Sequence, residues 1–423
     1  MVDQTEIQES RTVAQLCCRF CESKKMRKVL DLGTSPLCQK HVKLDDLGKP
    51  EKFYPLQLFV CEECWLVQIE EFTGADDIFD GDYAYFSSFS TSWLDHCKAY
   101  AAKMVSELNL THESLVMEAA SNDGYLLQYF KENDIPVLGI EPTQNTADAA
   151  IQIGVRTEVR FLGVDTAHDL ISIYGKADLL IGNNVLAHVP DLNDFVAGLA
   201  ILLGPDGVLT MEFPHLDKLI SLNQFDTIYH EHFSYFSLSA ANRIFAKHGI
   251  MLFDVEELTT HGGSLRIYGR HASQSGHLVT SRFKDMLAAE RAGGVETVGY
   301  YMSFEGRVME SKRCLVEFLI EQKRAGKKIV GYGAPGKGNT LLNYCGIRTD
   351  FLDYTVDRNP HKQGNYLPGT RIPILHPDTI FETKPDFVLL LPWNLKGELS
   401  AQLADVKNWG GKLVVPIPTV QVL

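Results

Sequence analysis

Two Cys-x-x-Cys pairs near the start of the chain constrain its amino-terminal fold more than any other feature. They are Cys18-Arg19-Phe20-Cys21 and Cys61-Glu62-Glu63-Cys64. Each pair places two thiolates on one tight turn, and two such turns can complete the tetrahedral shell of a structural zinc ion. A shell closed by four thiolates leaves no position for water or substrate, so this zinc would stabilise a fold and do no chemistry. The predicted ligands are Cys18, Cys21, Cys61 and Cys64.

Two alternatives to this ligand set remain open. The pairs lie further apart than in a compact zinc ribbon, and Cys17, Cys38 and His41 lie close enough in sequence to replace a ligand. Reduced core cysteines or a redox pair would be a different interpretation, but neither requires a second Cys-x-x-Cys. In a reducing compartment the nine cysteines should be thiols or metal ligands, and not disulfides.

Length and charge exclude several classes of protein. A chain of 423 residues, 45% of them hydrophobic, should form about two to four globular domains. The formal net charge of −14, with no cluster of Lys and Arg, argues against nucleic-acid binding. Met1–Ser10 lacks the apolar core of a signal peptide, and no apolar run reaches the ~20 residues that span a bilayer. We expect a cytoplasmic protein that binds neither nucleic acid nor membranes.

The hydrophobic pattern predicts an α/β protein of three domains. Short strands and turns surround the cysteine pairs up to about residue 71, a part too small for a good core without a metal. After a helical stretch at Trp93–Leu108, apolar runs alternate with helical segments, which is typical of a parallel sheet covered on both faces. The expected strands are Leu115–Glu118, Val137–Glu141, Ala177–Ile181 and Gly207–Glu212, with further candidates at Ile250–Val255 and Ser264–Tyr268.

A helical connector at about Thr280–Arg324 leads to a second sheet. Its four expected strands are Lys327–Gly333, Asp350–Asp357, Pro385–Leu391 and Lys412–Pro416. The predicted fold is therefore a small zinc-binding domain in residues 1–82, a central Rossmann-like domain in 83–272, and a connector with a carboxy-terminal Rossmann-like domain in 273–423.

Strand ends in the central sheet predict an adenosine site. The segment Glu118–Gly124 follows a buried strand and opens a helix, and its small residues let a ligand approach the backbone. The next strand ends at Glu141, whose carboxylate can accept both ribose hydroxyls, unless it only caps a helix. Because no G-x-G-x-x-G occurs in this sheet, S-adenosylmethionine fits better than NAD. The expected cofactor-binding residues are Glu118, Ser121, Asn122, Gly124, Glu141, Asn183 and Asn184.

The segment Tyr229–Phe236 is the densest cluster of titratable side chains. Its imidazoles, carboxylate and phenols supply a base, an orienting acid and a donor to an oxyanion. A metal site is a weaker interpretation, because the zinc-protease motif H-E-x-x-H is absent. A packing role would bury many polar groups unpaired. His188 is a second candidate that would face the cofactor, although a lone histidine is as often structural.

These motifs resemble the S-adenosylmethionine-dependent nucleotide-sugar C-methyltransferases of deoxysugar biosynthesis. The resemblance rests on the cysteine pairs, Glu118–Gly124, Asn183–His188 and Tyr229–Phe236, and it covers nearly the whole chain. It implies a zinc domain, a methyltransferase domain and a sugar-nucleotide domain, in that order. It also implies methylation of a 4-keto-6-deoxysugar linked to a nucleotide, with thymidine diphosphate as the expected carrier and C-3 preferred to C-5 as the methylated carbon.

The resemblance also assigns catalytic roles. A 4-keto group acidifies the hydrogens on adjacent carbons, so a base can form an enolate that attacks a sulfonium methyl group. His232 is the implied base, while Tyr229 and Glu231 orient it or stabilise the enolate. His188 would contact the 4-keto oxygen or its hydrogen-bond network, and Tyr83 matches an active-site tyrosine of the family.

A glycine-rich segment, Gly331–Thr340, predicts the substrate site. Backbone amides at the start of the following helix can cradle a diphosphate, and Lys337 adds positive charge. It is not a P-loop, because Gly338 stands where that motif has Ser or Thr. Gly333, Lys337 and Asn339 are the expected substrate-binding residues, unless the glycines only form tight turns.

Two competing functions and the oligomeric state complete the expectations. An NAD-dependent nucleotide-sugar oxidoreductase would use the carboxy-terminal fold. A non-catalytic zinc scaffold would leave the polar cluster at residues 229–232 unexplained. The three-domain pattern of the family favours a monomer.

Overall fold

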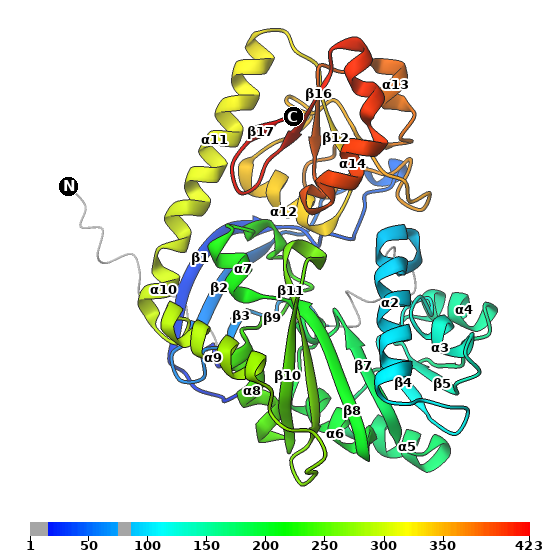
Figure 1. The fold of residues 1–423 in the computed structure, drawn as a ribbon. Helices are drawn as coiled ribbons and strands as arrows, with labels where there is room; N and C mark the ends of the chain where they lie inside the picture. Colours follow the sequence, from blue (N-terminus) through cyan, green and yellow to red (C-terminus); the bar gives the residue numbers. More distant parts are fainter. Residues whose placement is uncertain (1–15, 75–85) are drawn as a thin grey trace.

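Three β-sheets organise the computed structural model, which describes residues 16–74 and 86–423 (Figure 1). The strand orders are β1-β2-β3-β9, β10-β11-β8-β7-β4-β5-β6 and β14-β13-β12-β15-β16-β17. The predicted fold class is confirmed: a small amino-terminal unit precedes two α/β units. No helix within these described ranges combines the length and apolar character needed to cross a membrane.

The amino-terminal sheet is antiparallel and receives one strand from a distant part of the chain. β1 (Met26–Ser35) pairs with β2 (Tyr54–Cys61), and β2 pairs with β3 (Val67–Ile69). Every second residue of β2 is buried from Leu56 to Val60, because side chains alternate across a strand. β9 (Ser234–Tyr235) then pairs with β3. The polar segment 229–236 is thereby attached to the amino-terminal unit.

The central sheet has a switch point where two strand ends meet. β4 (Val116–Ala119) lies between β5 (Val137–Ile140) and β7 (Ala177–Asn183). The loops that leave β4 and β7 therefore face each other, which is where open α/β sheets bind ligands. The remaining strands of this sheet are β6 (Thr157–Glu158), β8 (Leu203–Pro214), β10 (Ile250–Leu258) and β11 (Ser264–His271).

The central sheet is not wholly parallel, which the sequence did not predict. β11 runs antiparallel to both β8 and β10. The reason is the short connection from β10 to β11, since a parallel pair needs a crossover of a dozen or more residues. The predicted strands were otherwise found at all six positions.

Helices cover both faces of the central sheet. Val116, Leu179 and Ile181 belong to the hydrophobic cluster of α2 and α3, whereas the intervening Met117 and Leu180 belong to that of α5, α6 and α8. This alternation is what period-two burial on two faces requires. The helices are α2 (Thr91–Glu107), α3 (Leu127–Lys131), α4 (Gln144–Gln152), α5 (Val164–Tyr174), α6 (Leu192–Leu202), α7 (Leu216–Ser221) and α8 (Leu238–Lys247).

The connector is helical as predicted, and the carboxy-terminal sheet is parallel except for β17. The expected strand at Asp350–Asp357 shrinks to a two-residue β13, and the equally short β14 and β17 were not predicted, because two residues carry no periodicity. The strands are β12 (Ile329–Tyr332), β13 (Thr355–Val356), β14 (Ile374–Leu375), β15 (Phe387–Leu390), β16 (Lys412–Val415) and β17 (Gln421–Val422). The helices are α9 (Ser281–Gly293), α10 (Val298–Met302), α11 (Phe304–Arg324), α12 (Gly336–Cys345), α13 (Thr379–Thr383) and α14 (Lys396–Gln402).

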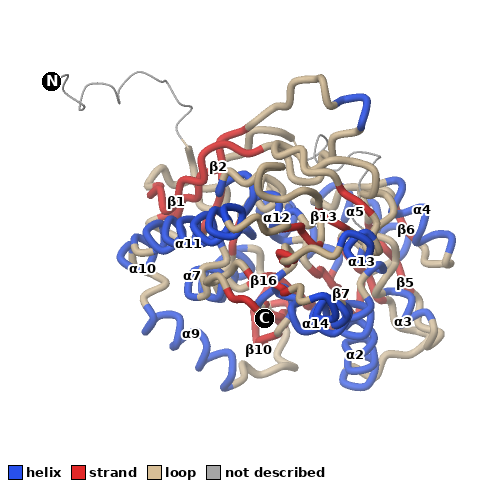
Figure 2. The backbone as a smooth tube through the Cα atoms, turned by 90° about the horizontal axis from the view of Figure 1, so that it is seen from above, coloured by secondary structure: helices blue, strands red, loops and turns tan. Residues whose placement is uncertain are grey.

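The units pack closely against one another. The long helix α11 lies beside β1 and reaches the carboxy-terminal unit (Figures 1 and 2). One hydrophobic cluster joins Leu58 of β2, Phe304 of α11 and Leu342 of α12. The predicted domain boundaries at 82/83 and 272/273 stay predictions. Short 3-10 helices are η1 (Leu44–Asp46), η2 (Ser87–Phe89), η3 (Leu186–His188), η4 (Phe225–Thr227), η5 (Thr260–Gly262), η6 (Trp393–Leu395) and η7 (Ala404–Trp409).

Candidate active site and zinc centre

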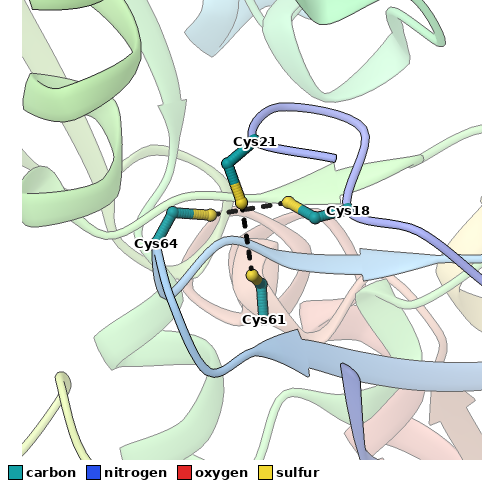
Figure 3. Close-up of side chains that lie close together, drawn as sticks. All are labelled: Cys18, Cys21, Cys61 and Cys64. Atoms are coloured by element: carbon teal, nitrogen blue, oxygen red, sulfur yellow. Dashed lines mark hydrogen bonds between the residues drawn. The ribbon is translucent and has the colours of Figure 1, made fainter. Parts of the chain in front are cut away.

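The four predicted metal ligands converge on one point (Figure 3). The Sγ atoms of Cys18 and Cys64 lie 3.4 Å apart, and those of Cys21 and Cys61 lie 3.5 Å apart. All four sulfurs lie within 4.8 Å of one another. A tetrahedron with metal–sulfur bonds of about 2.3 Å has edges of about 3.8 Å, so the set fits a zinc ion with little movement.

The two cysteine turns have the same backbone design. The carbonyl of Cys18 accepts from the amide of Glu22, and the carbonyl of Cys61 accepts from the amide of Trp65, both at 2.9 Å. Glu22 and Trp65 adopt φ values of 61° and 64°, in the left-handed region that closes each turn. Among the described residues the cluster includes none of the substitutes considered from sequence, namely Cys17, Cys38 and His41.

Arg19, between the first two cysteines, ties the zinc centre to the polar segment. Its guanidinium donates to the carbonyls of Ile69 and Pro190, both at 2.9 Å. The same group lies 5.3 Å from the ring centre of Phe233, next to His232. The zinc centre is therefore part of the structure that places the candidate base.

Glu141 holds the predicted cofactor loop in place. Its Oε2 accepts from the amide of Asn122 at 2.9 Å, and its Oε1 accepts from the amide of Thr143 at 3.0 Å. The side chains of Thr143 and Thr146 also hydrogen-bond this carboxylate. An ionised carboxylate offers about four acceptor positions, so ribose hydroxyls would bind here by replacing these two side-chain contacts. Burial raises the pKa of Glu141.

Other predicted cofactor residues surround this loop and differ in their surroundings. Ser121 is fully buried, and its Oγ would lie 2.3 Å from a Cβ on Gly139, so this serine packs over β5. Gly124, at φ 76°, faces α4. Glu118 is fully buried within β4, and its Oε1 accepts from the hydroxyl of Tyr125 at 2.9 Å.

Unsatisfied polar atoms at the switch point fit a bound ligand. Asn183, at the end of β7, is 6% exposed, and neither atom of its amide has a partner in the described part of the chain. The same holds for Oδ1 of Asn184 and Oε2 of Glu118. Buried polar groups normally have partners. These atoms therefore suit the polar groups of S-adenosylmethionine.

His232 carries its proton on the nitrogen that faces the protein. Its Nδ1 lies 2.9 Å from the carbonyl of Thr227. A carbonyl only accepts, so Nδ1 donates and the lone pair resides on Nε2. Burial, assisted by the neighbouring His188, lowers the pKa of His232 well below its usual range. The imidazole is therefore neutral near pH 7, the form that a base requires.

Two predicted partners of His232 lie against its ring, and a third lies beyond them. The ring centres of Tyr229 and His188 lie 4.0 Å and 4.7 Å from that of His232. Burial lowers the pKa of His188 to about 4, and its ring bonds the backbone of Glu231. Glu231 instead directs its carboxylate to Cys38. The acceptor that orients His232 is thus Thr227, which no side-chain pattern could reveal.

His230 faces away from this cluster, and Tyr83 lies outside the described residues. The Nε2 of His230 lies 3.1 Å from the carbonyl of Pro55, and its ring lies 5.8 Å from that of Tyr54. His230 therefore anchors the segment to β2.

The start of α12 reaches the same cluster. A Cβ on Gly336 would lie 3.6 Å from Cζ of Tyr229. Lys337 follows, with its Nζ 2.8 Å from Oδ1 of Asn394 and 4.8 Å from the ring centre of Trp393. Its charge also contributes to the lowered pKa of His232. The structure thus brings a predicted substrate residue beside the candidate base.

Asn339 and Gly333 complete the predicted substrate residues. Asn339 is 1% exposed, and its amide has no partner among the residues described. Gly333 adopts φ 89°, and a Cβ there would lie 2.6 Å from Pro392. Near them, Asp357 uses both carboxylate oxygens on backbone amides, those of Ala334 and Asn359, so it closes the loop.

Comparison with known proteins decides the family. Family models match residues 18–79 as a zinc binding domain, 96–255 as a methyltransferase domain and 259–418 as a C-methyltransferase C-terminal domain. The C-methyltransferase NovU of Streptomyces niveus is 35% identical over 409 residues, which are 96% of each chain. This chain belongs to the C-methyltransferase family.

Solved structures match a smaller part of this chain than NovU does. The magnesium protoporphyrin IX methyltransferase of Synechocystis PCC 6803, with bound S-adenosylmethionine, is 17% identical, with a TM-score of 0.32 over 42% of this chain and 78% of its own. The 1,6-didemethyltoxoflavin-N1-methyltransferase of Burkholderia thailandensis is 16% identical, with a TM-score of 0.36 over 49% and 95%.

The C-methyltransferase uses S-adenosylmethionine as methyl donor and contains a zinc-binding domain. The Cys18–Cys64 cluster fits zinc, and the residues at the ends of β4, β5 and β7 fit the donor. S-adenosylmethionine, when bound, supplies an electrophilic sulfonium methyl group. The zinc centre has four protein ligands and no open position for a substrate.

Replacing Glu141 with Ala should weaken S-adenosylmethionine binding at least tenfold, as measured by titration calorimetry. Each charge-assisted hydrogen bond lost from the ribose costs about 1.5–3 kcal/mol. Asp178→Ala is a matched control, because Asp178 also accepts a backbone amide, that of Leu115, but at the opposite end of the strands. Unchanged affinity in Glu141→Ala would place the ribose contact elsewhere.

Proposed function

We propose that this C-methyltransferase methylates C-3 of a 4-keto-6-deoxysugar carried by thymidine diphosphate. The observation that supports it most is His232, a neutral imidazole with its lone pair on Nε2, next to Tyr229, His188 and Lys337. Methyl transfer to a ring carbon requires removal of a proton from that carbon, and this group is suited to removing it.

In the proposed reaction, Nε2 of His232 takes the proton from C-3, and the carbonyl oxygen at C-4 gains the negative charge. Tyr229, whose ring lies against the imidazole, supplies a hydrogen-bond donor for that oxyanion. The lowered pKa of His188 keeps it neutral, and its single N–H donates to the carbonyl of Glu231, so His188 acts on the oxyanion only through the hydrogen-bond network around His232. C-3 then takes the methyl group as its bond to the sulfonium sulfur breaks; the sulfur keeps that electron pair, and the carbonyl at C-4 forms again.

The proposed nucleotide site is the start of α12. Backbone amides at a helix amino terminus and a lysine are suited to a diphosphate. Lys337 and Asn339 lie in the first turn of this helix, and the side-chain amide of Asn339 has no partner among the described residues. Because this turn also contacts Tyr229, a bound diphosphate would place the sugar beside His232.

An NAD-dependent oxidoreductase is less well supported. The family models match a methyltransferase domain and a C-methyltransferase C-terminal domain, and the full-length relative is a C-methyltransferase. Methylation at C-5 would use the same activation by the 4-keto group. The position of the new methyl group in the product distinguishes it from methylation at C-3.

The test is incubation with methyl-labelled S-adenosylmethionine and a panel of 4-keto sugar nucleotides. We expect one labelled product, heavier than its substrate by one methyl group, with the label on C-3 in the NMR spectrum. Label on C-5 would show that the enzyme methylates C-5 and not C-3. A change in absorbance at the nicotinamide wavelength without methyl transfer would favour the oxidoreductase. If the sugar nucleotides bind but none is methylated, the result would favour the non-catalytic zinc scaffold.

A further inference from the structure

A buried thiol from the amino-terminal unit contacts the polar segment. Cys38 lies in the turn after β1, and its Sγ is 3.2 Å from Oε1 of Glu231, 193 positions along the chain. Each of the two residues is 3% exposed. Within residues 16–74 and 86–423, this thiol lies outside the cysteine cluster that could hold a metal ion.

The carboxy-terminal unit fixes Cys38 from the other side. A Cβ on Gly336, the first residue of α12, would lie 2.9 Å from its Sγ, so only glycine lets the helix approach the thiol this closely. Val42, just beyond the turn, exchanges two backbone hydrogen bonds of 2.9 Å with Tyr366. All three units of the protein therefore meet at this thiol.

The thiol of Cys38 donates its hydrogen bond to the carboxylate of Glu231. Burial raises the pKa of Cys38 well above its usual range, so the thiol keeps its proton. Burial also raises the pKa of Glu231 to about 7, and three groups oppose this rise: the Cys38 hydrogen bond and the charges of Lys362 and Lys40. A donor to the charged form of a carboxylate stabilises that form.

We propose that Cys38 is a positioning residue that holds the Glu231 side chain and keeps its carboxylate ionised for the reaction. The inference rests on the proposed function, because it concerns the residue next to the candidate base. Glu231 acts on the site through its backbone as well, since its carbonyl accepts from the ring of His188. A shift of Glu231 would therefore move His188 relative to His232.

Infrared spectroscopy tests the hydrogen bond without any turnover. The difference spectrum between wild type and Cys38→Ala isolates the S–H stretching band of Cys38. We expect this band to change frequency as the pH passes through about 7, because the acceptor changes from a neutral carboxyl to a carboxylate. In Glu231→Gln the band should no longer respond to pH. If the frequency of this band changes neither with pH nor in Glu231→Gln, the proposal is wrong.

The pH profile of methyl transfer tests the positioning role. Losing the donor should raise the pKa of Glu231 by about one unit, so Cys38→Ala should need a higher pH for full activity. At pH 7 the ionised fraction would fall from about a half to about a tenth, giving a rate about fivefold lower that recovers near pH 9. Cys38→Ser, which retains a donor, should keep the wild-type profile.

Cys345→Ala is the matched control, because Cys345 is also buried but forms no hydrogen bond to Glu231. It should keep the wild-type pH profile even if its melting temperature falls as in Cys38→Ala. A Cys38→Ala rate that is low at every pH, with the same profile as wild type, would make Cys38 merely structural. If no sugar nucleotide is methylated, the proposed function fails while the infrared result still decides the hydrogen bond.

Discussion

Replacing His232 with Asn should lower methyl transfer by ~10²–10⁴-fold while both ligands still bind, because general-base catalysis contributes a factor of that size. The amide nitrogen of Asn can replace Nδ1 as donor to the carbonyl of Thr227, so the local fold should persist. What is lost is the lone pair on Nε2. Binding and chemistry should therefore separate in this variant.

Hydrogen exchange in deuterium oxide measures the proton removal by itself. Wild-type enzyme with a 4-keto substrate and no methyl donor should exchange the hydrogen on the carbon to be methylated, and His232→Asn should not. His230→Asn is the control, because His230 belongs to the same segment but faces Pro55 and Tyr54. If His232→Asn exchanges as fast as wild type, the base is another residue, with Tyr229 and His188 next.

Replacing Cys61 with Ser should release the zinc and strongly destabilise the protein. Apparent binding free energies of structural zinc are on the order of 10 kcal/mol, and this binding is coupled to folding. Activity should fall along with stability, since Arg19 and the β3–β9 pairing join the cysteine turns to the segment of His232. The metal takes no part in chemistry but places the residues that do.

Metal analysis and thermal unfolding measure this effect. Wild type should contain one zinc per chain, and Cys61→Ser should contain none and melt at a lower temperature. Cys17→Ser is the control, since Cys17 is exposed and lies outside the cluster; it should keep its zinc and the wild-type melting temperature. If the wild-type protein without zinc melts at the same temperature as the protein with zinc, the assignment is wrong.

Local patterns in the sequence were sufficient for the zinc ligands and for the order of elements. A Cys-x-x-Cys pair forms its turn from adjacent residues, and the two turns here are alike, so Cys18, Cys21, Cys61 and Cys64 could be predicted without the fold. The strands β4, β5 and β7 carry apolar runs that alternate with helical segments, and this alternation predicted the α/β class and the position of Glu141 at a strand end.

Other features depend on contacts between distant residues and were decided only by the tertiary structure. The strand β9 has two residues, too few for a periodic pattern, and its pairing with β3 joins positions far apart in the chain. The carbonyl of Thr227 orients His232, and a backbone acceptor leaves no mark on side-chain identity. The meeting of Cys38, Glu231 and Gly336 likewise required three units to pack together, because local sequence encodes turns and periods but not which distant surfaces meet.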